Sequence, residues 1–252
     1  MNIWRGLGKR AGTYTVMAMS WALLPGGAAL ADAGAPQRPL LLELFTSQGC
    51  SSCPPADAVL RELSDHLDLL PLAFHVDYWN NLGWVDPYSA AAFTSRQQAY
   101  AEVRGFEVYT PQLVVEGKSD VIGSSRSDVY ATIASARREA KSAASSIRRS
   151  GKDVMIAIGA VGGVDAAAAD VYLLSFDGRD ESSIGGGENS GRKVVYANVV
   201  RSMRKVAEWR NQPLNLTEHL QPQESGDRLA LLVQDRKGMV WAVASTASVS
   251  QP

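Results

Sequence analysis

The sequence predicts an α/β protein in which an N-terminal part alternates strands and helices and a β-rich part follows. A short apolar run from Leu40 ends in a turn, two cysteines and a stretch with helical spacing, as a buried strand followed by a helix would. Strand-like and helix-like segments then alternate up to about Ala143. From Gly151 onward, short β-branched or alternating runs are separated by Gly, Asp and Pro, which is typical of antiparallel strands.

The first strand and helix enclose the motif Cys50-Ser-Ser-Cys53. Two thiols at the start of a helix meet backbone N–H groups and a helix dipole that favour a thiolate. One face of the predicted helix carries four apolar residues: Val59, Leu60, Leu63 and Leu67. The pattern therefore indicates a dithiol/disulfide site on a strand–turn–helix unit.

Redox chemistry is the favoured interpretation of the two cysteines, which are the only ones in the 252 residues. A disulfide across two residues closes a very short loop and adds little stability. Structural zinc needs four ligands, and the three histidines, His66, His75 and His219, are scattered. Two alternatives stay open: a protein that holds Cu(I) through both thiolates with His75 or a Met, and a redox-inert binding module.

Residues 1–31 have the pattern of a signal peptide. Three basic residues precede an apolar stretch, Ala11 to Leu24, that is too short to span a bilayer. Ala29-Leu30-Ala31 fits the small-x-small cleavage pattern, so the mature chain is expected to begin near Asp32 and to be periplasmic or secreted.

Charge and hydropathy limit the classes of partner that are expected for the mature chain. Cleavage removes three basic residues and no acidic ones, which takes the formal net charge from −1 to −4. Nucleic-acid binding is not expected without a basic patch, and no later apolar run is long enough for a stable membrane anchor. The expected partners are protein thiols and disulfides, including a redox partner protein, and no cofactor or resident metal is expected.

The segments after the dithiol helix alternate in type. In order, they are a buried strand at Pro71–Asp77, a helix starting at Asp86-Pro87 and ending at Gly105, a strand at Gln112–Glu116 opened by Thr110-Pro111, a hairpin turn at Gly117-Lys118, and a helix from Ser127 to about Arg138, capped by Ser127 or the preceding Ser. Further strands are expected at Asp153–Ala160, Asp170–Phe176, Arg192–Met203, Arg228–Gln234 and Met239–Ala244.

A glycine-rich stretch, Gly185–Gly191, interrupts the second half. It is not expected to bind phosphate, because a strand rather than a helix follows and Lys193 is displaced from the required position. We interpret it as a mobile loop, of the kind that can lie over a neighbouring site.

The order of strand, Cys50-Ser-Ser-Cys53, helix, strand, helix, Thr110-Pro111 strand, hairpin and helix resembles the thioredoxin fold over about Pro39 to Ala143. The resemblance implies that the Thr110-Pro111 bond is cis and faces the dithiol. It also implies that Cys50 is the nucleophile and Cys53 the resolving thiol. Glu43, in the first strand, would be a buried acid that relays a proton for Cys53, or else an exposed acid at the strand end.

A closer resemblance extends over nearly the whole mature chain. The stretches LLELFTSQGCSSCPPAD, HVDYWNNLGW, YTPQLVVEG and GENSGRKVVYANVVRS look like a secreted thioredoxin-like family of Gram-negative bacteria classed as a domain of unknown function. The family implies a thioredoxin-like domain followed by a β-rich domain. The change in residue pattern places the first at 39–145 and the second, an antiparallel sandwich-like domain, at 151–252, with the boundary in the mostly small and polar stretch Lys141–Ser150. The family has no settled substrate and therefore does not indicate one for this chain. The expected function, a thiol:disulfide oxidoreductase, rests on the Cys50-Ser-Ser-Cys53 motif.

Two features of the motif differ from simple thioredoxins. Ser51-Ser52 offers no cation to lower the pKa of the Cys50 thiol, and Pro54-Pro55 carries no N–H. Because each proline also disfavours the α conformation before it, the helix is expected to begin only near Pro55. We expect a moderately activated Cys50, more exposed than Cys53 because it lies in the loop.

Cleavage after Ala31 predicts a measurable terminus. N-terminal sequencing of the exported protein should begin at or near Asp32, because the small-x-small pattern ends at Ala31. A mature protein that retains Met1 would contradict export by this route.

Overall fold

The computed structural model describes residues 38–139, 142–163, 168–222, 224 and 226–246, so the signal-peptide segment lies outside the described residues. The elements in this part of the chain are β1 (Leu40–Thr46), α1 (Pro54–Leu63), β2 (Leu69–His75), α2 (Ala91–Arg104), β3 (Gln112–Val115), β4 (Ser119–Ile122), α3 (Arg126–Glu139), β5 (Ser145–Ser150), β6 (Asp153–Ile158), β7 (Ala169–Ser183), β8 (Lys193–Trp209), β9 (Leu214–His219), β10 (Arg228–Asp235) and β11 (Val240–Ser245).

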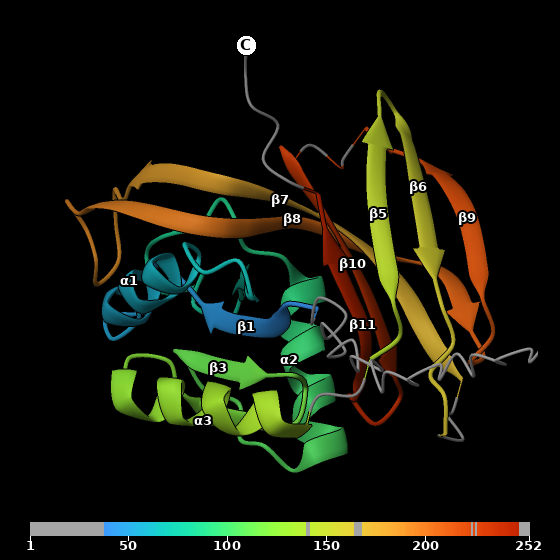
Figure 1. The fold of residues 1–252 in the computed structure, drawn as a ribbon. Coiled ribbons are helices and arrows are strands. Elements are labelled where there is room, and N and C mark those ends of the chain that lie inside the picture. The colour runs from blue at the N-terminus through green and yellow to red at the C-terminus, as the bar shows by residue number, and fades with distance from the viewer. Residues whose placement is uncertain (1–37, 140–141, 164–167, 223, 225, 247–252) are drawn as a thin grey trace, which may run out of the picture. The chain divides into compact units, whose positions relative to one another are not determined.

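Eight strands form one mixed sheet in the order β11-β10-β7-β8-β2-β1-β3-β4, and β5-β6-β9 form a second sheet (Figure 1). The β1–β2 and β2–β8 pairs are parallel, and the other pairs of the large sheet are antiparallel. The predicted α/β class is confirmed, with strands in the majority. The strands of the first and second halves of the chain meet where β8 lies beside β2.

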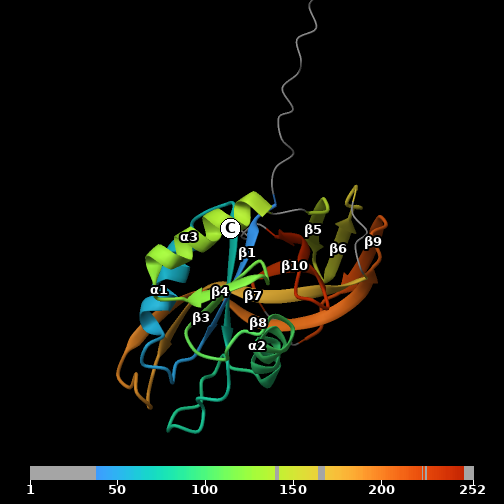
Figure 2. The ribbon, with the colours of Figure 1, turned by 90° about the horizontal axis from the view of Figure 1, so that it is seen from below.

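The strand β1 lies at the centre of the helical layers, and all seven of its residues are buried. Its alternate side chains face opposite sides of the sheet. Leu42 and Leu44 pack in a cluster with α1 and α3, whereas Leu41 and Phe45 pack in a second cluster with α2. Figure 2 shows α1 and α3 on one side of the strands and α2 on the other. Burial on both faces explains why the β1 sequence is nearly continuous in apolar residues.

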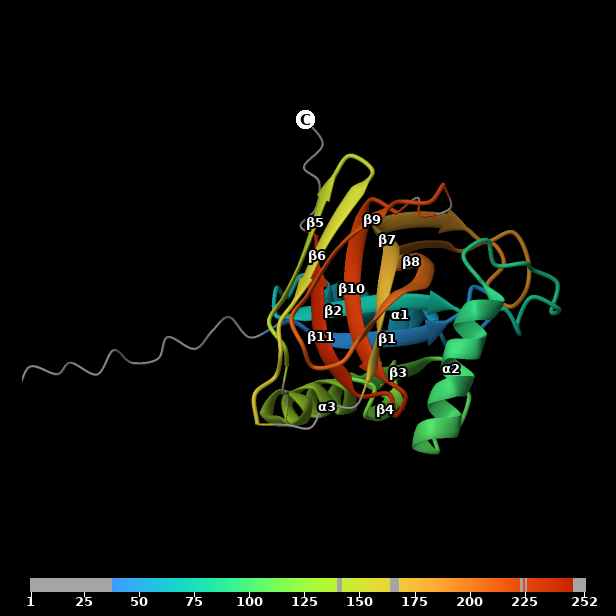
Figure 3. The ribbon, with the colours of Figure 1, turned by 90° about the vertical axis from the view of Figure 1, so that its right-hand side faces the viewer.

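The three-stranded sheet packs against the part of the large sheet formed by β7, β10 and β11 (Figure 3). Ile147 and Ile156 of the small sheet share a core with Leu231 and Trp241 of the large one. The small sheet therefore covers the face of these strands opposite to the one that shares a core with α2.

The β2–β8 contact is irregular because Pro71 lies within β2 and has no N–H to donate. Ladder pairing between these strands is limited to Ala73 and Val199. Asn198, with a positive φ of 50°, donates its side-chain amide to the Pro71 carbonyl at 2.7 Å. A side chain thus satisfies the backbone group that a regular ladder would have paired.

Two predicted helix boundaries were wrong. The helix α1 ends at Leu63, and Leu67 lies beyond it with its side chain fully exposed. The helix α2 begins at Ala91 rather than at Asp86-Pro87, because the Asp86 carboxylate accepts hydrogen bonds from His75 and from the backbone of Gln48 and Tyr88. Its end was predicted correctly: Gly105 has φ 72° and donates to the Ala101 carbonyl.

The second half also differs from the prediction. Strands β7 and β8 extend well beyond the predicted runs, and β9 was not predicted. The stretch assigned as a boundary, Lys141–Ser150, contains β5, which pairs with β6 through Ile147 and Ile156. The Gly117-Lys118 turn between β3 and β4 was predicted correctly.

Leu63 and Leu67 form a matched pair for a stability test. Leu63→Ala should lower the free energy of unfolding by about 2–5 kcal/mol, because the side chain is fully buried. Leu67→Ala should change it by less than about 0.5 kcal/mol, because the side chain is exposed. Urea unfolding of the mature protein measures both, and equal losses would contradict the position of the helix end.

Candidate functional site

The two cysteines lie in the turn between β1 and α1 and form a disulfide, with their Cα atoms 5.4 Å apart. Cys53 is the N-cap of α1, and its carbonyl accepts hydrogen bonds from the backbone N–H groups of Ala56 and Asp57. Pro54 and Pro55 fill the first helical positions, where an N–H would have no helical partner. The helix thus begins at Pro54, about where the prolines predicted, and its first N–H groups are absent or already bonded.

Both cysteine side chains are fully buried, whereas Ser51 and Ser52 between them are exposed. The expectation that Cys50 is the more exposed thiol was therefore wrong for the disulfide form. One segment bonded to the turn that carries Cys50 is the loop at the end of the β7–β8 hairpin, Gly185–Gly191.

The Gly185–Gly191 loop is tied to the dithiol turn by hydrogen bonds. The buried Asn189 side chain donates to the carbonyls of Gln48 at 2.9 Å and Cys50 at 2.8 Å. Glu188 accepts a hydrogen bond from the Ser51 N–H at 3.2 Å. These contacts join residues about 140 positions apart, so no local pattern could have revealed them.

Two tryptophans of the segment 78–84 also contact the dithiol turn, at Gln48 and Gly49. Trp84 donates to the Gln48 side chain at 2.8 Å, and a Cβ added to Gly185 would lie 2.8 Å from the Trp84 ring. Trp79 packs closely on Gly49, where an added Cβ would lie 2.9 Å from the Trp79 Cβ. The glycines are needed for this close approach.

The Thr110-Pro111 bond is cis, as the resemblance predicted. Thr110 accepts a hydrogen bond from the Trp79 indole at 2.9 Å, and Trp79 packs on Gly49, next to Cys50. The Pro111 carbonyl accepts from Gly123. The fold therefore links Thr110 to the dithiol turn through Trp79.

Glu43 is buried, but its carboxylate is bound on the α2 side of the sheet. Arg96 donates to both carboxylate oxygens, at 2.6 and 3.0 Å, and the Tyr100 hydroxyl donates to one of them. This side is opposite to the cluster of α1. The structure thus places Glu43 in an ion pair with Arg96 and not beside the cysteine helix.

The buried acid on the dithiol side is Asp57, one helical turn after Cys53. Thr46 donates to its carboxylate at 2.8 Å. Burial raises the pKa of Asp57 to about 6, although His75 and the Thr46 hydrogen bond act to lower it. The sequence signal was available, since Asp57 follows Cys53 by four residues and faces the same side of the helix.

His75 and Asp86 lie next in this buried group. The His75 Nδ1 is 2.7 Å from an Asp86 carboxylate oxygen, and the ring packs edge-on against Tyr88 and Tyr196. Burial acts to raise the pKa of Asp86, but His75 and hydrogen bonds from the backbone outweigh it, so the pKa lies below its ordinary value. The pKa of Asp57 is therefore raised and that of Asp86 is lowered, although both carboxyls interact with His75.

Within the described residues, no group of three or more His, Cys, Asp and Glu side chains is placed to hold a metal ion. In the same part of the chain, no helix is long and apolar enough to cross a membrane.

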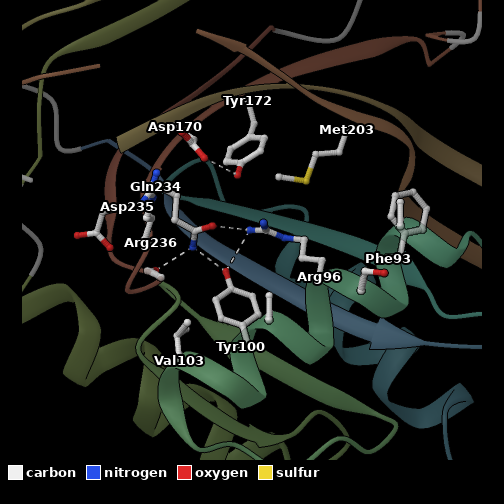
Figure 4. Close-up of a pocket in the computed structure, with 14 residues that line it drawn as sticks. Phe93, Arg96, Tyr100, Val103, Asp170, Tyr172, Met203, Gln234, Asp235 and Arg236 are labelled. Carbon is white, nitrogen blue, oxygen red and sulfur yellow. Dashed lines mark hydrogen bonds between the residues drawn. The ribbon is translucent and has the colours of Figure 1, made fainter. Parts of the chain in front are cut away.

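A pocket of about 420 Å³ lies between α2 and strands β7, β8 and β10 (Figure 4). Its volume falls in the range of small-molecule sites, but neither cysteine lines it. The polar groups of Arg96, Tyr100 and Gln234 bond to one another, with 3.1 Å between Arg96 and Gln234 and 2.8 Å between Gln234 and Tyr100. These groups are largely satisfied within the protein, so the dithiol is the better candidate for chemistry.

The fold and the site define an α/β protein with a covered Cys-x-x-Cys disulfide between its first strand and first helix. The chain belongs to the family described as "Protein of unknown function (DUF1223)", whose model matches residues 41–234. The expected membership in a family of unknown function is thereby confirmed.

Two solved structures are similar. The crystal structure of protein AGR_C_4864 from Agrobacterium tumefaciens has a TM-score of 0.70 and 29% identity, over 86% of this chain and 97% of that one. HBP35 of Porphyromonas gingivalis has a TM-score of 0.61 and 9% identity, over 87% of this chain and 79% of that one. At 9% identity the likeness concerns the fold alone. No curated protein matches this chain.

Asp57→Asn tests the electrostatics of the site. A carboxyl with a raised folded-state pKa contributes stability below its unfolded value, 3.8, and that stability is lost as the pH rises through about 6. Asp57→Asn should therefore gain stability over the wild type between about pH 4 and pH 7, by on the order of 3 kcal/mol. Urea unfolding at successive pH values measures this.

The matched control is Asp65, which is exposed and lies outside the buried group of Asp57, His75 and Asp86. Asp65→Asn should follow the wild-type pH profile. If the free energy of unfolding changes with pH in the same way in Asp57→Asn and in the wild type, the raised pKa of Asp57 is contradicted.

Proposed function

We propose that this protein is an exported thiol:disulfide oxidoreductase whose dithiol is Cys50 and Cys53. The observation that carries the proposal is the Cys50–Cys53 disulfide at the start of α1, with the buried acid Asp57 one turn along the same helix. A disulfide that closes so short a loop contributes little to stability. Its position beside a titratable acid suits exchange chemistry better than a structural role.

The proposal assigns residues 39–145 to a thioredoxin-like arrangement. Supporting it are the order β1, dithiol, α1, β2, α2, the cis Thr110-Pro111 bond, the β3–β4 hairpin and α3. The β-rich part at 151–252 would supply the cover of the site through its Gly185–Gly191 loop. Export is proposed from the signal-peptide pattern alone.

In the proposed reaction the reduced Cys50 thiolate attacks one sulfur of a substrate disulfide. A Cys50–substrate disulfide forms, and the other substrate sulfur leaves as a thiolate that takes up a proton. The Cys53 thiolate then attacks the Cys50 sulfur, which forms the Cys50–Cys53 disulfide and releases the second substrate thiol. Two electrons pass from the dithiol to the substrate, and the reverse sequence oxidises a substrate dithiol.

Asp57 is proposed to accept the Cys53 proton in the second step. The two residues are four positions apart at the start of α1, a spacing that puts their side chains on one face. A pKa of about 6 suits proton exchange near neutral pH. The relay proposed from the sequence moves from Glu43 to Asp57, because Arg96 and Tyr100 occupy the Glu43 carboxylate.

Substitution of each cysteine tests the proposal. Cys53→Ser should accumulate mixed disulfides with partner proteins, because Cys50 still attacks and nothing resolves the product. Cys50→Ser should trap almost none. Both variants should lose the catalysis of insulin reduction by a dithiol donor that the wild type is expected to show. Non-reducing electrophoresis and insulin turbidity measure these outcomes.

Asp57→Asn separates the proton role from the thiol roles, because both cysteines remain. Its mixed disulfides should persist longer than those of the wild type. A wild type without insulin reduction, together with no trapped partner from Cys53→Ser, would contradict the proposed function and leave the Cu(I)-binding protein and the redox-inert module as the alternatives.

A further inference from the structure

In the oxidised protein the sulfur atoms of the Cys50–Cys53 disulfide are not accessible to a reaction partner. Thiol–disulfide exchange requires a thiolate to reach a sulfur atom, yet both Cys50 and Cys53 are fully buried. The residues between them are exposed, so the motif lies at the surface while neighbouring segments shield its sulfur atoms. The Gly185–Gly191 loop is hydrogen-bonded to the backbone of this turn at Gln48, Cys50 and Ser51.

We infer that the Gly185–Gly191 loop is a cover that must leave the disulfide before a partner thiol reacts, and that Asn189 is the residue that holds it closed. The inference rests on the proposed function and adds regulation of access to it. Asn189 spans the turn by donating to the carbonyls on either side of Gly49, those of Gln48 and Cys50. Releasing this one side chain removes both hydrogen bonds.

The base of the loop is fixed, which confines the movement to the loop itself. The Ile184 N–H donates to the Arg192 carbonyl at 2.9 Å, and the Gly191 N–H donates to the Ile184 carbonyl at 2.8 Å. Ile184 is buried. Below this base the hairpin continues as paired strands from Ser183 and Lys193.

The closed loop packs on Trp84 through its glycines, and its side-chain hydrogen bonds to the dithiol turn come from Glu188 and Asn189. Gly187 and Gly191 have positive φ values of 67° and 80°, and four of the seven loop residues are glycine. The Asn189 Oδ1 atom is buried without a hydrogen-bond partner among the described residues. A buried unsatisfied acceptor lowers the stability of the closed state, which favours a loop that can be displaced.

The rate at which dithiothreitol reduces the Cys50–Cys53 disulfide tests the inference. In the oxidised mature protein, Asn189→Ala should raise this rate about tenfold or more, the effect of removing two hydrogen bonds from the closed state. Ser190→Ala is the matched control: Ser190 lies in the same loop and is exposed, and its rate should equal that of the wild type. Timed alkylation of the released thiols measures the rate.

A second variant separates the hydrogen bonds from side-chain size. Asn189→Asp keeps the volume and places a carboxylate against two carbonyls, so it should be reduced as fast as Asn189→Ala. Thermal unfolding of each variant shows that it is folded. Wild-type rates in the folded variants would overturn the inference, and if Asn189→Ala does not fold, Asn189→Asp decides.

The reduction rates test the cover separately from the proposed function. The direct reduction requires no catalysis, so faster reduction in Asn189→Ala with no insulin reduction by the wild type would support the cover and reject the oxidoreductase. Insulin reduction with unchanged rates in both Asn189 variants would do the opposite.

Discussion

The join between β2 and β8 is the constraint on which the site depends. Pro71 removes an N–H from β2, and Asn198 satisfies the Pro71 carbonyl with its side chain where a ladder would otherwise do so. Strands β7 and β8 form one long hairpin, so fixing β8 beside β2 also fixes where the end of that hairpin lies. The Gly185–Gly191 loop is thereby brought to the turn that follows β1, where Asn189 bonds to the carbonyls of Gln48 and Cys50.

Two buried acids near the centre of the sheet are stabilised in different ways. Burying a carboxylate is costly unless it is paired or protonated. Glu43 is paired with Arg96 on the α2 side, so its role is to hold α2 against the sheet. Asp57 is instead hydrogen-bonded to the neutral Thr46 hydroxyl, and burial raises its pKa to about 6. The same physical cost therefore produces a structural ion pair on one face and a group suited to proton exchange on the other.

The errors at the two predicted helix ends have different causes, and only the one at Asp86 is a tertiary contact. Asp86-Pro87 is a good local signal for a helix start, but the Asp86 carboxylate is bound by Gln48 and His75, and the helix begins later at Ala91. Leu67 continued an apolar spacing, but the chain leaves the helix after Leu63. Local propensity predicts elements well where nothing distant competes, and it misplaces their ends where distant partners bind the same residues.

The sequence by itself determined the mixed α/β class, the position of Cys50 and Cys53 between the first strand and the first helix, and most strands, because these follow from periodicity and local turn chemistry. The tertiary structure alone decided that both cysteines are covered, that Asp57 rather than Glu43 lies on the dithiol side, and that Asn189 bonds to the turn. Asn189 and Cys50 are 139 positions apart. Contacts at such separation depend on how strands pair and layers pack, and no local pattern of residues encodes them.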